Sequence, residues 1–396
     1  MVQLDLVQTL AAAGLVLFAG HALLRRLPLL ARHNVPAPVV GGLAVALVLA
    51  GLRAAGHEAV RFDTTLQAPL MVAFFTAIGL GASLPLLRAG GPAVVVCLGL
   101  ATALAVLQNL VGGAMASLLG VTPLLGVIAG ALTLAGGPAT GLAFAPQFEK
   151  AGVGGAAALA IASAMAGIVS AGVVGGPLGT WLIEKRRLAR RSPAPAAATP
   201  SLPGAVPAPA SGLALLKAVV VLLAAMALGS VVSAGVAAAG VILPAYIGAM
   251  LVAALLRNLD DATGWIGLPH PLLADLGHAA LALFLAMALM TLRLWELAGL
   301  ALPLAAILAV QVVVASAVCL WPCFRLFGGD YEAAVTTSGF CGFMLGTTAN
   351  AMANMDALSE RYGEAPRAYL VVPVVGGFFI DFTNALVITA FLNLWR

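Results

Sequence analysis

Charged residues are scarce in this sequence. Asp, Glu, Lys and Arg make up 9% of its 396 residues, whereas hydrophobic residues make up 62%. Soluble globular domains carry about 25% charged residues, so this composition excludes a soluble domain. The mean hydropathy of +1.09 indicates a membrane protein instead. The net charge of +4 does not suggest a nucleic-acid partner, because the basic residues lie at the ends of apolar runs.

Cysteine and histidine are also rare. The four cysteines are Cys97, Cys319, Cys323 and Cys341, and no histidine or second cysteine pair completes a metal-binding set. We expect all four to pack as small apolar residues. The five histidines are scattered along the chain, so the sequence predicts no resident metal centre and no organic cofactor.

Apolar runs long enough to cross a bilayer account for most of the chain. A spanning helix needs roughly 20 apolar residues, and we predict about ten such runs. They lie near 6–24, 36–55, 66–87, 93–119, 153–183, 213–238, 242–257, 273–294, 298–324 and 368–394. The first run has no basic segment before it and no small-residue cleavage site, so we do not interpret it as a signal peptide. The expected fold class is an all-α polytopic membrane protein.

One segment, residues 184–212, is clearly not apolar. It opens with five Lys and Arg residues and continues in Pro, Ala and Ser, which is typical of an extended linker. If this linker is cytoplasmic, most of the Lys and Arg residues of the chain are cytoplasmic too, as the positive-inside rule requires. With about ten spans, both termini then lie outside the cell.

The linker separates two halves, 1–183 and 213–396, that resemble each other. VPAPVVGGLAVAL, around Pro36, matches LPAYIGAMLVAAL, around Pro244, about 208 residues later. FTAIGLGASLPLLRAGG, which contains Gly90, matches FLAMALMTLRLWELAGL, which contains Gly299. Because about five spans per half is an odd number, the second half enters the membrane in the opposite direction, as in the inverted repeats of secondary transporters. The alternative is chance similarity between stretches rich in Ala, Leu and Gly.

Two segments, 123–148 and about 330–360, are too interrupted by Gly, Pro, Thr and Asn to be straight spans. Non-helical backbone at membrane depth is tolerated where it lines a cavity or is buried in protein. We therefore expect two re-entrant hairpins, one in each repeat, that enter from opposite sides and meet near the midplane. The alternative is a pair of loops at the membrane surface, although such loops usually carry more charge.

The hairpin tips carry the candidate substrate-binding residues. Glycine allows a tight turn and a close approach of backbone N–H groups to a ligand, and helix N-termini attract carboxylates. Neighbouring hydroxyl and amide side chains would orient the substrate. The candidates are Gly136, Gly137, Thr140, Gly346, Thr347, Thr348, Asn350 and Asn354.

A candidate cation site lies in the last predicted span, where Asp381 and Asn384 are three residues apart on one helix face. A central Asp costs roughly 2.5–3.5 kcal/mol on insertion scales, so it is a functional candidate by default. Carboxylate and amide oxygens are ligands that Na⁺, as a hard cation, prefers. Asn109 and Gln311 are weaker candidates, because buried amides often hold helices together. The alternative for Asp381 is a protonated structural carboxyl. Since Asp381 has no second buried carboxylate, the sequence does not indicate an intramembrane enzyme.

Four segments together resemble the sodium/glutamate symporter family over nearly the full length of the chain. They are PLMVAFFTAIGLGASLPLLRAGG, LALFLAMALMTLRLWELAGLALP, GFMLGTTANAMANMDALSERYG and YLVVPVVGGFFIDFTNALVI. The resemblance implies Na⁺-coupled uptake of L-glutamate by homodimers in a bacterial inner membrane. It also implies a transport domain that carries the hairpins past a fixed scaffold in an elevator-like step.

The first hairpin tip departs from the pattern of that family. Its members carry Gly-Gly-His-Gly-Thr where residues 136–140 read Gly-Gly-Pro-Ala-Thr, and a Gly-His pair is Gly339-Phe340 here. The expected substrate is therefore L-glutamate or a closely related anionic amino acid. A carrier of another small carboxylate, coupled to Na⁺ or H⁺, and a passive facilitator are the alternatives.

Overall fold

The computed structural model describes residues 2–56, 60–89, 91–188, 212–238, 244–297 and 299–395. Within these ranges the regular structure is helical, apart from β1 (Val2–Gln3) and β2 (Val60–Arg61), a short parallel pair. Most of the predicted linker, 189–211, lies outside the described residues. The four cysteines are free and buried, in agreement with a packing role.

Eight helices in the described part of the chain are long and apolar enough to cross a bilayer, and each overlaps a predicted span. Six are single helices and two are composite. The single helices are α1 (Leu6–Arg26), α3 (Ala37–Ala54), α6 (Gly91–Leu118), α9 (Ala156–Lys185), α10 (Gly212–Ala238) and α12 (His270–Met290). The first composite span consists of α13 (Ala301–Val318), η3 (Cys319–Cys323) and α14 (Phe324–Leu326). The second consists of α17 (Pro366–Val374), η4 (Val375–Phe379) and α18 (Ile380–Leu394).

The remaining two predicted spans do not reach that length and hydropathy. The run 66–87 is divided into α4 (Gln67–Gly81) and α5 (Leu84–Ala89), and α11 (Ala245–Thr263) ends in a charged turn. The end of α11 stabilises the break between α4 and α5. The Ser83 hydroxyl donates to Asp261 at 2.6 Å, and Leu84 N donates to Asn258 Oδ1 at 2.7 Å. Of the about ten predicted spans, eight therefore coincide with helices in the described residues that are long and apolar enough to cross a bilayer.

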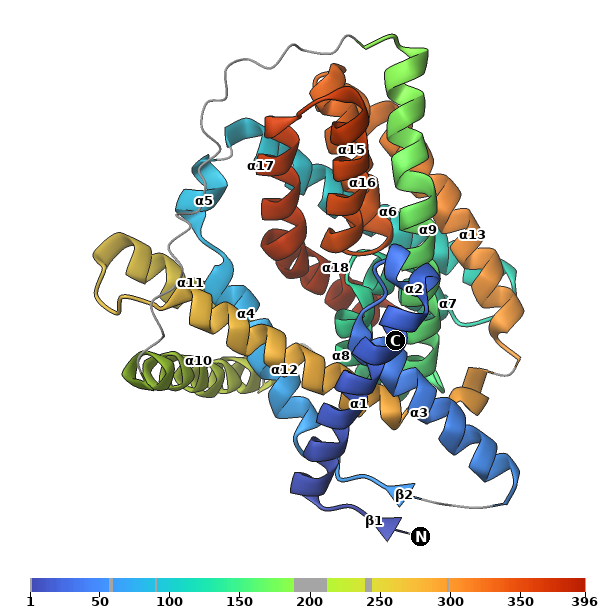
Figure 1. Ribbon diagram of the computed structural model, residues 1–396, viewed down its shortest axis with the longest axis vertical. Helices are drawn as coiled ribbons and strands as arrows, with labels where there is room; N and C mark the ends of the chain where they lie inside the picture. Colours follow the sequence, from blue (N-terminus) through green and yellow to red (C-terminus); the bar gives the residue numbers. More distant parts are fainter. Residues whose placement is uncertain are drawn as a thin grey trace.

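The helices pack as two groups, and each group takes helices from both halves of the sequence (Figure 1). The first group consists of α1, α3, α4, α10, α11 and α12, with the short α2 (Pro28–Arg32) attached to α1. The second consists of α6, α9, α13, α17, α18 and the helices of the two interrupted segments described below. The largest buried hydrophobic cluster lies mainly in the second group.

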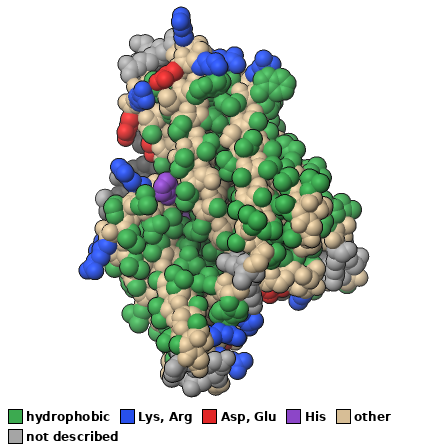
Figure 2. All heavy atoms as spheres, turned by 90° about the vertical axis from the view of Figure 1, so that its right-hand side faces the viewer, with side chains coloured by type: hydrophobic (Ala, Val, Ile, Leu, Met, Phe, Trp, Pro, Cys, Tyr) green, Lys and Arg blue, Asp and Glu red, His purple; other side chains and the backbone are tan. Residues whose placement is uncertain are grey.

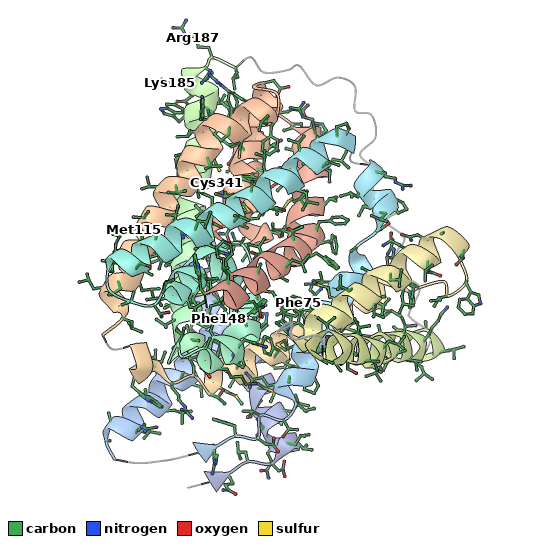
Figure 3. All side chains as sticks on the ribbon, turned by 180° about the vertical axis from the view of Figure 1, so that it is seen from behind. Phe75, Met115, Phe148, Lys185, Arg187 and Cys341 are labelled. Atoms are coloured by element: carbon green, nitrogen blue, oxygen red, sulfur yellow. The ribbon has the colours of Figure 1, made fainter. Side chains whose placement is uncertain are left out.

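The outer surface fits a membrane environment. Hydrophobic side chains cover most of the middle of the face in Figure 2, and Lys and Arg lie at its top and bottom and along its left edge. Lys185 and Arg187 lie at one end of the long axis in Figure 3, opposite the end where Figure 1 places the N-terminus. A broad apolar surface with charges at its margins is typical of a protein that crosses a bilayer.

Helix α9 presents a face of small residues to the second interrupted segment. A Cβ added at Gly167 would overlap the carbonyl oxygen of Leu345, and one at Gly179 would come within 2.9 Å of Ser338 Cβ. Ser338 also donates its hydroxyl to Gly175 O at 2.7 Å. The absence of side chains at these positions lets the two backbones approach each other, as in other membrane helix pairs.

Gly167→Ala tests this close packing. The added methyl group would meet a backbone oxygen that cannot rotate away, and overpacking typically costs about 1–3 kcal/mol. We expect a lower midpoint of thermal unfolding in detergent. Gly99→Ala is the matched control, because Gly99 also lies inside a helix but has nothing within 4 Å of an added Cβ. Equal midpoints for the two variants would contradict the close contact.

Candidate functional site

The two interrupted segments fold as helical hairpins. Hairpin 1 consists of α7 (Pro123–Val127), a π-helical turn (Ile128–Leu132) and α8 (Gly137–Lys150). Hairpin 2 consists of α15 (Tyr331–Leu345) and α16 (Thr348–Tyr362). The backbone leaves helical geometry at Gly130, with φ −106° and ψ −136°, and at Gly346, with φ −145° and ψ −107°. Each predicted segment therefore contains a break near its centre.

The tips of the two hairpins meet. A Cβ added at Gly137 would lie 4.0 Å from Thr347 Cγ2, and Gly137 has a φ of +66°, which favours glycine. These two residues begin α8 and α16, so two helix N-termini converge on one place. In Figure 1, α15 and α16 lie above α7 and α8, so the hairpins approach from opposite ends of the molecule. The convergence concentrates the partial positive charges of both helices.

The N-termini differ in how their N–H groups are used. Thr347 caps α16 by accepting from Asn350 N, and its hydroxyl donates to Asn350 Oδ1 at 2.8 Å. At the start of α8 no side chain caps the helix, and the nearby Thr140 packs against Gly136. The uncapped α8 N-terminus offers N–H groups that a carboxylate could bind.

Two adjacent side chains of α6 hold the two breaks. Gln108 Nε2 donates to Met344 O of hairpin 2 at 3.0 Å, and Asn109 Oδ1 accepts from Ala131 N of hairpin 1 at 3.0 Å. Gln311 of α13 donates in turn to the backbone oxygen of Gln108 at 2.6 Å. The two glutamines and Asn109 are completely buried. They satisfy backbone groups that the breaks leave without helical partners.

Asn384 joins the same arrangement. Its Nδ2 donates to Ala131 O at 2.9 Å, and that oxygen also accepts from Gly136 N at 3.1 Å, next to the hairpin 1 tip. Asp381 lies one turn earlier in α18, and in the described part of the chain its carboxylate has no hydrogen bond or ion pair. The predicted carboxylate and amide pair therefore lies beside hairpin 1.

The buried amides differ in which atom remains without a partner among the described residues. The oxygen is unpaired in Gln108, Gln311 and Asn384, whereas the nitrogen is unpaired in Asn109. A cation needs oxygen ligands, so the first three side chains have a suitable free atom and Asn109 does not. Within the described residues there is no cluster of three His, Cys, Asp or Glu side chains that could hold a metal ion.

Hairpin 2 is fastened to the surrounding helices by its polar side chains. Asn350 Nδ2 donates to Ile168 O at 3.2 Å and Asn354 Nδ2 donates to Ala171 O at 3.1 Å, both in α9. The Thr348 hydroxyl donates to Gly376 O at 2.6 Å, in the interrupted region between α17 and α18. The predicted residues of hairpin 2 thus point to two different neighbours rather than to one cluster.

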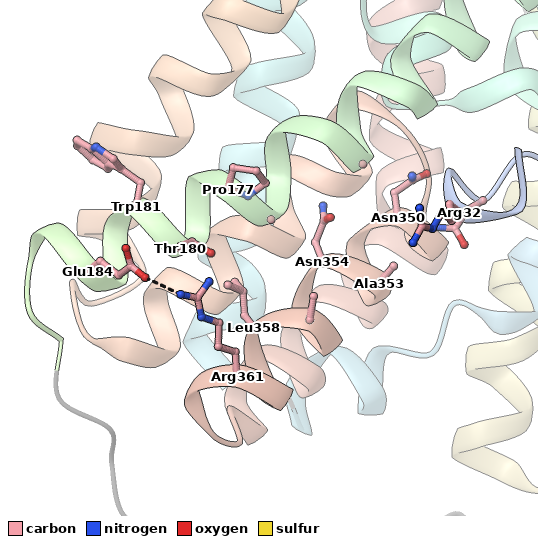
Figure 4. Close-up of a pocket in the computed structure, with 14 residues that line it drawn as sticks. Arg32, Pro177, Thr180, Trp181, Glu184, Asn350, Ala353, Asn354, Leu358 and Arg361 are labelled. Atoms are coloured by element: carbon pink, nitrogen blue, oxygen red, sulfur yellow. Dashed lines mark hydrogen bonds and ion pairs between the residues drawn. The ribbon is translucent and has the colours of Figure 1, made fainter. Parts of the chain in front are cut away.

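Asn350 and Asn354 also line a cavity of about 740 Å³ between α2, α9 and α16 (Figure 4). The predicted residues Gly136, Gly137, Thr140, Asp381 and Asn384 do not line it. Sequence reasoning missed its other polar walls, Arg32, Thr180, Glu184 and Arg361, because they come from distant segments. Gln108, beside Asn109 in an apolar run, is like Asn109 and Gln311 a weaker candidate from the sequence, as a residue that either holds helices together or touches a ligand.

Comparison with known proteins gives one consistent family. The family described as Sodium/glutamate symporter matches residues 2–364. A protein of Escherichia coli (strain K12) named Sodium/glutamate symporter is 40% identical over 400 residues, covering 100% of this chain and 99% of the relative. A protein of the same name from Haemophilus influenzae is 36% identical over 386 residues, covering 96% of this chain and 95% of the relative.

Asn109→Ala tests the support of hairpin 1. The change removes the acceptor of Ala131 N, and a buried N–H without a partner costs about 1–3 kcal/mol. We expect faster amide hydrogen exchange over residues 128–136, measured by mass spectrometry. Thr102→Val is the control, because the Thr102 hydroxyl bonds only to Leu98 O in its own helix. Unchanged exchange in Asn109→Ala would show that this contact does not hold the hairpin.

Proposed function

The chain belongs to the sodium/glutamate symporter family, and we propose that it imports L-glutamate together with Na⁺ through the meeting point of the two hairpin tips. The observation that carries this proposal is the closeness of Gly137 to Thr347, since it brings two helix N-termini together in a mostly apolar protein. A transporter of anions needs such a positive site away from water, and the family supplies the substrate class.

The substrate would bind at the two tips. Its carboxylates would accept hydrogen bonds from backbone N–H groups at Gly136, Gly137 and around Gly346. Thr140, Thr347, Thr348, Asn350 and Asn354 would fix its orientation. The support for this assignment is the absence of a side-chain cap on α8, together with the position of Thr347 at the start of α16.

Sodium would bind beside hairpin 1. Asp381 supplies a carboxylate one turn before Asn384 in α18, and Asn384 supplies an amide oxygen that has no hydrogen-bond partner among the described residues. Gln311 and Gln108 offer two further oxygens close to the same break. Asn109 would act on the site indirectly by holding Ala131, since its oxygen is already engaged. Na⁺ is cargo and coupling ion here, and the proposal involves no organic cofactor and no enzymatic step.

Coupling follows from the closeness of the two sites. Ala131 O is bonded both to Asn384, in the proposed ion site, and to Gly136, at the proposed substrate site. A bound cation lowers the electrostatic cost of an anion nearby and would order the same tip. Each net positive charge that moves inward gains about 2.3 kcal/mol per 100 mV of membrane potential.

Transport would occur by an elevator-type movement of one helix group past the other. In this proposal the group containing α1, α3, α4, α10, α11 and α12 is the scaffold, and the group containing both hairpins is the transport domain. The halves 1–183 and 213–396 would be inverted repeats with re-entrant hairpins. The protein would be a homodimer in a bacterial inner membrane, with both termini outside and the linker in the cytoplasm.

The first test is uptake of radiolabelled L-glutamate into proteoliposomes, with and without an inward Na⁺ gradient. Accumulation that collapses without Na⁺ supports the symporter. Uptake that only equilibrates, whatever the Na⁺ gradient, would instead establish a passive facilitator. Because residues 138 and 339–340 depart from the family pattern, competition by other small carboxylates should be measured in the same assay.

Asp381→Asn tests the proposed cation site. The change keeps the size of the side chain and removes its charge, so we expect the Na⁺ stimulation of uptake to fall by at least about tenfold. Asp275→Asn, at an exposed carboxylate of α12, serves as the control and should keep wild-type stimulation. Normal Na⁺ dependence in Asp381→Asn would remove Asp381 from the site.

A further inference from the structure

The cavity in Figure 4 carries an unbalanced positive charge. Glu184 and Arg361 form an ion pair at 3.1 Å toward one end, and the Tyr362 hydroxyl donates to the same carboxylate at 2.6 Å. Arg32 lies at the other end, beside Asn350. In the described part of the chain the Arg32 guanidinium has no hydrogen bond or ion pair, so it is the cavity-lining cation left for an anionic ligand.

An acceptor group lines the same cavity. Asn354 donates its Nδ2 to Ala171 O, but its Oδ1 has no donor among the described residues and faces Gly176 on the cavity wall. A Cβ added at Gly172, another wall residue, would lie 3.7 Å from Asn350 Nδ2, so no side chain separates the two amides from the α9 wall. One cation and one unpaired acceptor atom thus line the cavity.

This combination is complementary to an acidic amino acid. A carboxylate fits the guanidinium, which can donate two parallel hydrogen bonds, and an ammonium group fits the amide oxygen. The volume of about 740 Å³ is within the range of small-molecule sites and leaves room for water. A purely anionic ligand would satisfy Arg32 but would leave Asn354 Oδ1 unpaired.

We propose that this cavity is a second subsite for the acidic amino acid, in which Arg32 holds the side-chain carboxylate and Asn354 Oδ1 takes the ammonium group. The proposal rests on the proposed function, because it gives the transported substrate a waiting position next to the hairpin 2 tip. Asn350 connects the two places, since it lies in the first turn of α16 and on the cavity wall.

The subsite also joins the two helix groups. Arg32 ends α2, which is attached to α1 in the first group, whereas Asn350 and Asn354 belong to hairpin 2 in the second. A ligand held by both would be released when the groups separate. The subsite contains none of the residues proposed for Na⁺, so its affinity should not require Na⁺.

A cysteine reporter tests the subsite without relying on transport. The four native cysteines are buried, and Ala353 is exposed on the cavity wall between Asn350 and Asn354. We would introduce Ala353→Cys into the full-length protein and measure the rate of maleimide labelling in detergent without Na⁺. We expect L-glutamate to slow the labelling of Ala353→Cys and L-glutamine to slow it less. Chloride at equal ionic strength should leave the labelling rate unchanged.

Variants at Arg32 decide the assignment. We expect Arg32→Gln to raise the half-protecting concentration of L-glutamate at least about tenfold, and Arg32→Lys to raise it less. Arg26→Gln is the matched control, because Arg26 is an exposed arginine in the same region that does not line the cavity. Labelling of Ala54→Cys, far from the cavity, should be independent of L-glutamate.

The outcomes separate this inference from the proposed function. No protection of Ala353→Cys by L-glutamate, or equal protection in Arg32→Gln and Arg26→Gln, would overturn the subsite even if uptake is Na⁺-coupled. Equal protection by chloride would reduce the site to an unspecific anion site and would also overturn it. If L-glutamate protects Ala353→Cys from labelling in an Arg32-dependent way but uptake does not depend on Na⁺, the subsite is supported and the symporter is contradicted.

Discussion

Backbone groups at a helix break inside an apolar protein must find hydrogen-bond partners, and the rest of this structure depends on how that is done. The breaks at Gly130 and Gly346 free N–H and C=O groups far from bulk water, where each unpaired group is costly. Gln108 and Asn109, adjacent in α6, bond to one hairpin each, and Asn384 adds a bond to Ala131 O. A few amides therefore fix both tips relative to each other.

The same contacts explain how the proposed substrate site and the proposed ion site can share one element. The π-helical turn of hairpin 1 is bonded on one side to α18, which carries Asp381, and leads directly into the glycines at its tip. Hairpin 2 can approach because α9 presents small residues to it, and Asn350 and Asn354 use this closeness to bond α9 carbonyls. Local satisfaction of the backbone thus produces a polar centre in a hydrophobic protein.

Much of this architecture follows from the sequence, because apolar runs and clusters of Gly, Pro and Thr are local signals. The interrupted segments 123–148 and about 330–360 each contain two helical parts separated by a break, and eight predicted spans overlap long apolar helices. The break at Ala82–Ser83 was not predicted, since it depends on Asn258 and Asp261 from a distant helix. The cavity was missed for the same reason: Glu184 and Arg361 are 177 residues apart in the chain.

The central claim is that sodium and the amino acid bind cooperatively at the hairpin tips, and calorimetry on the purified protein tests it most directly. Titrating L-glutamate at rising Na⁺ concentrations should give a dissociation constant that falls as Na⁺ rises, and L-glutamate should strengthen Na⁺ binding by the same factor, because thermodynamic coupling is reciprocal. A dissociation constant for L-glutamate that stays constant from zero to saturating Na⁺ would contradict the account.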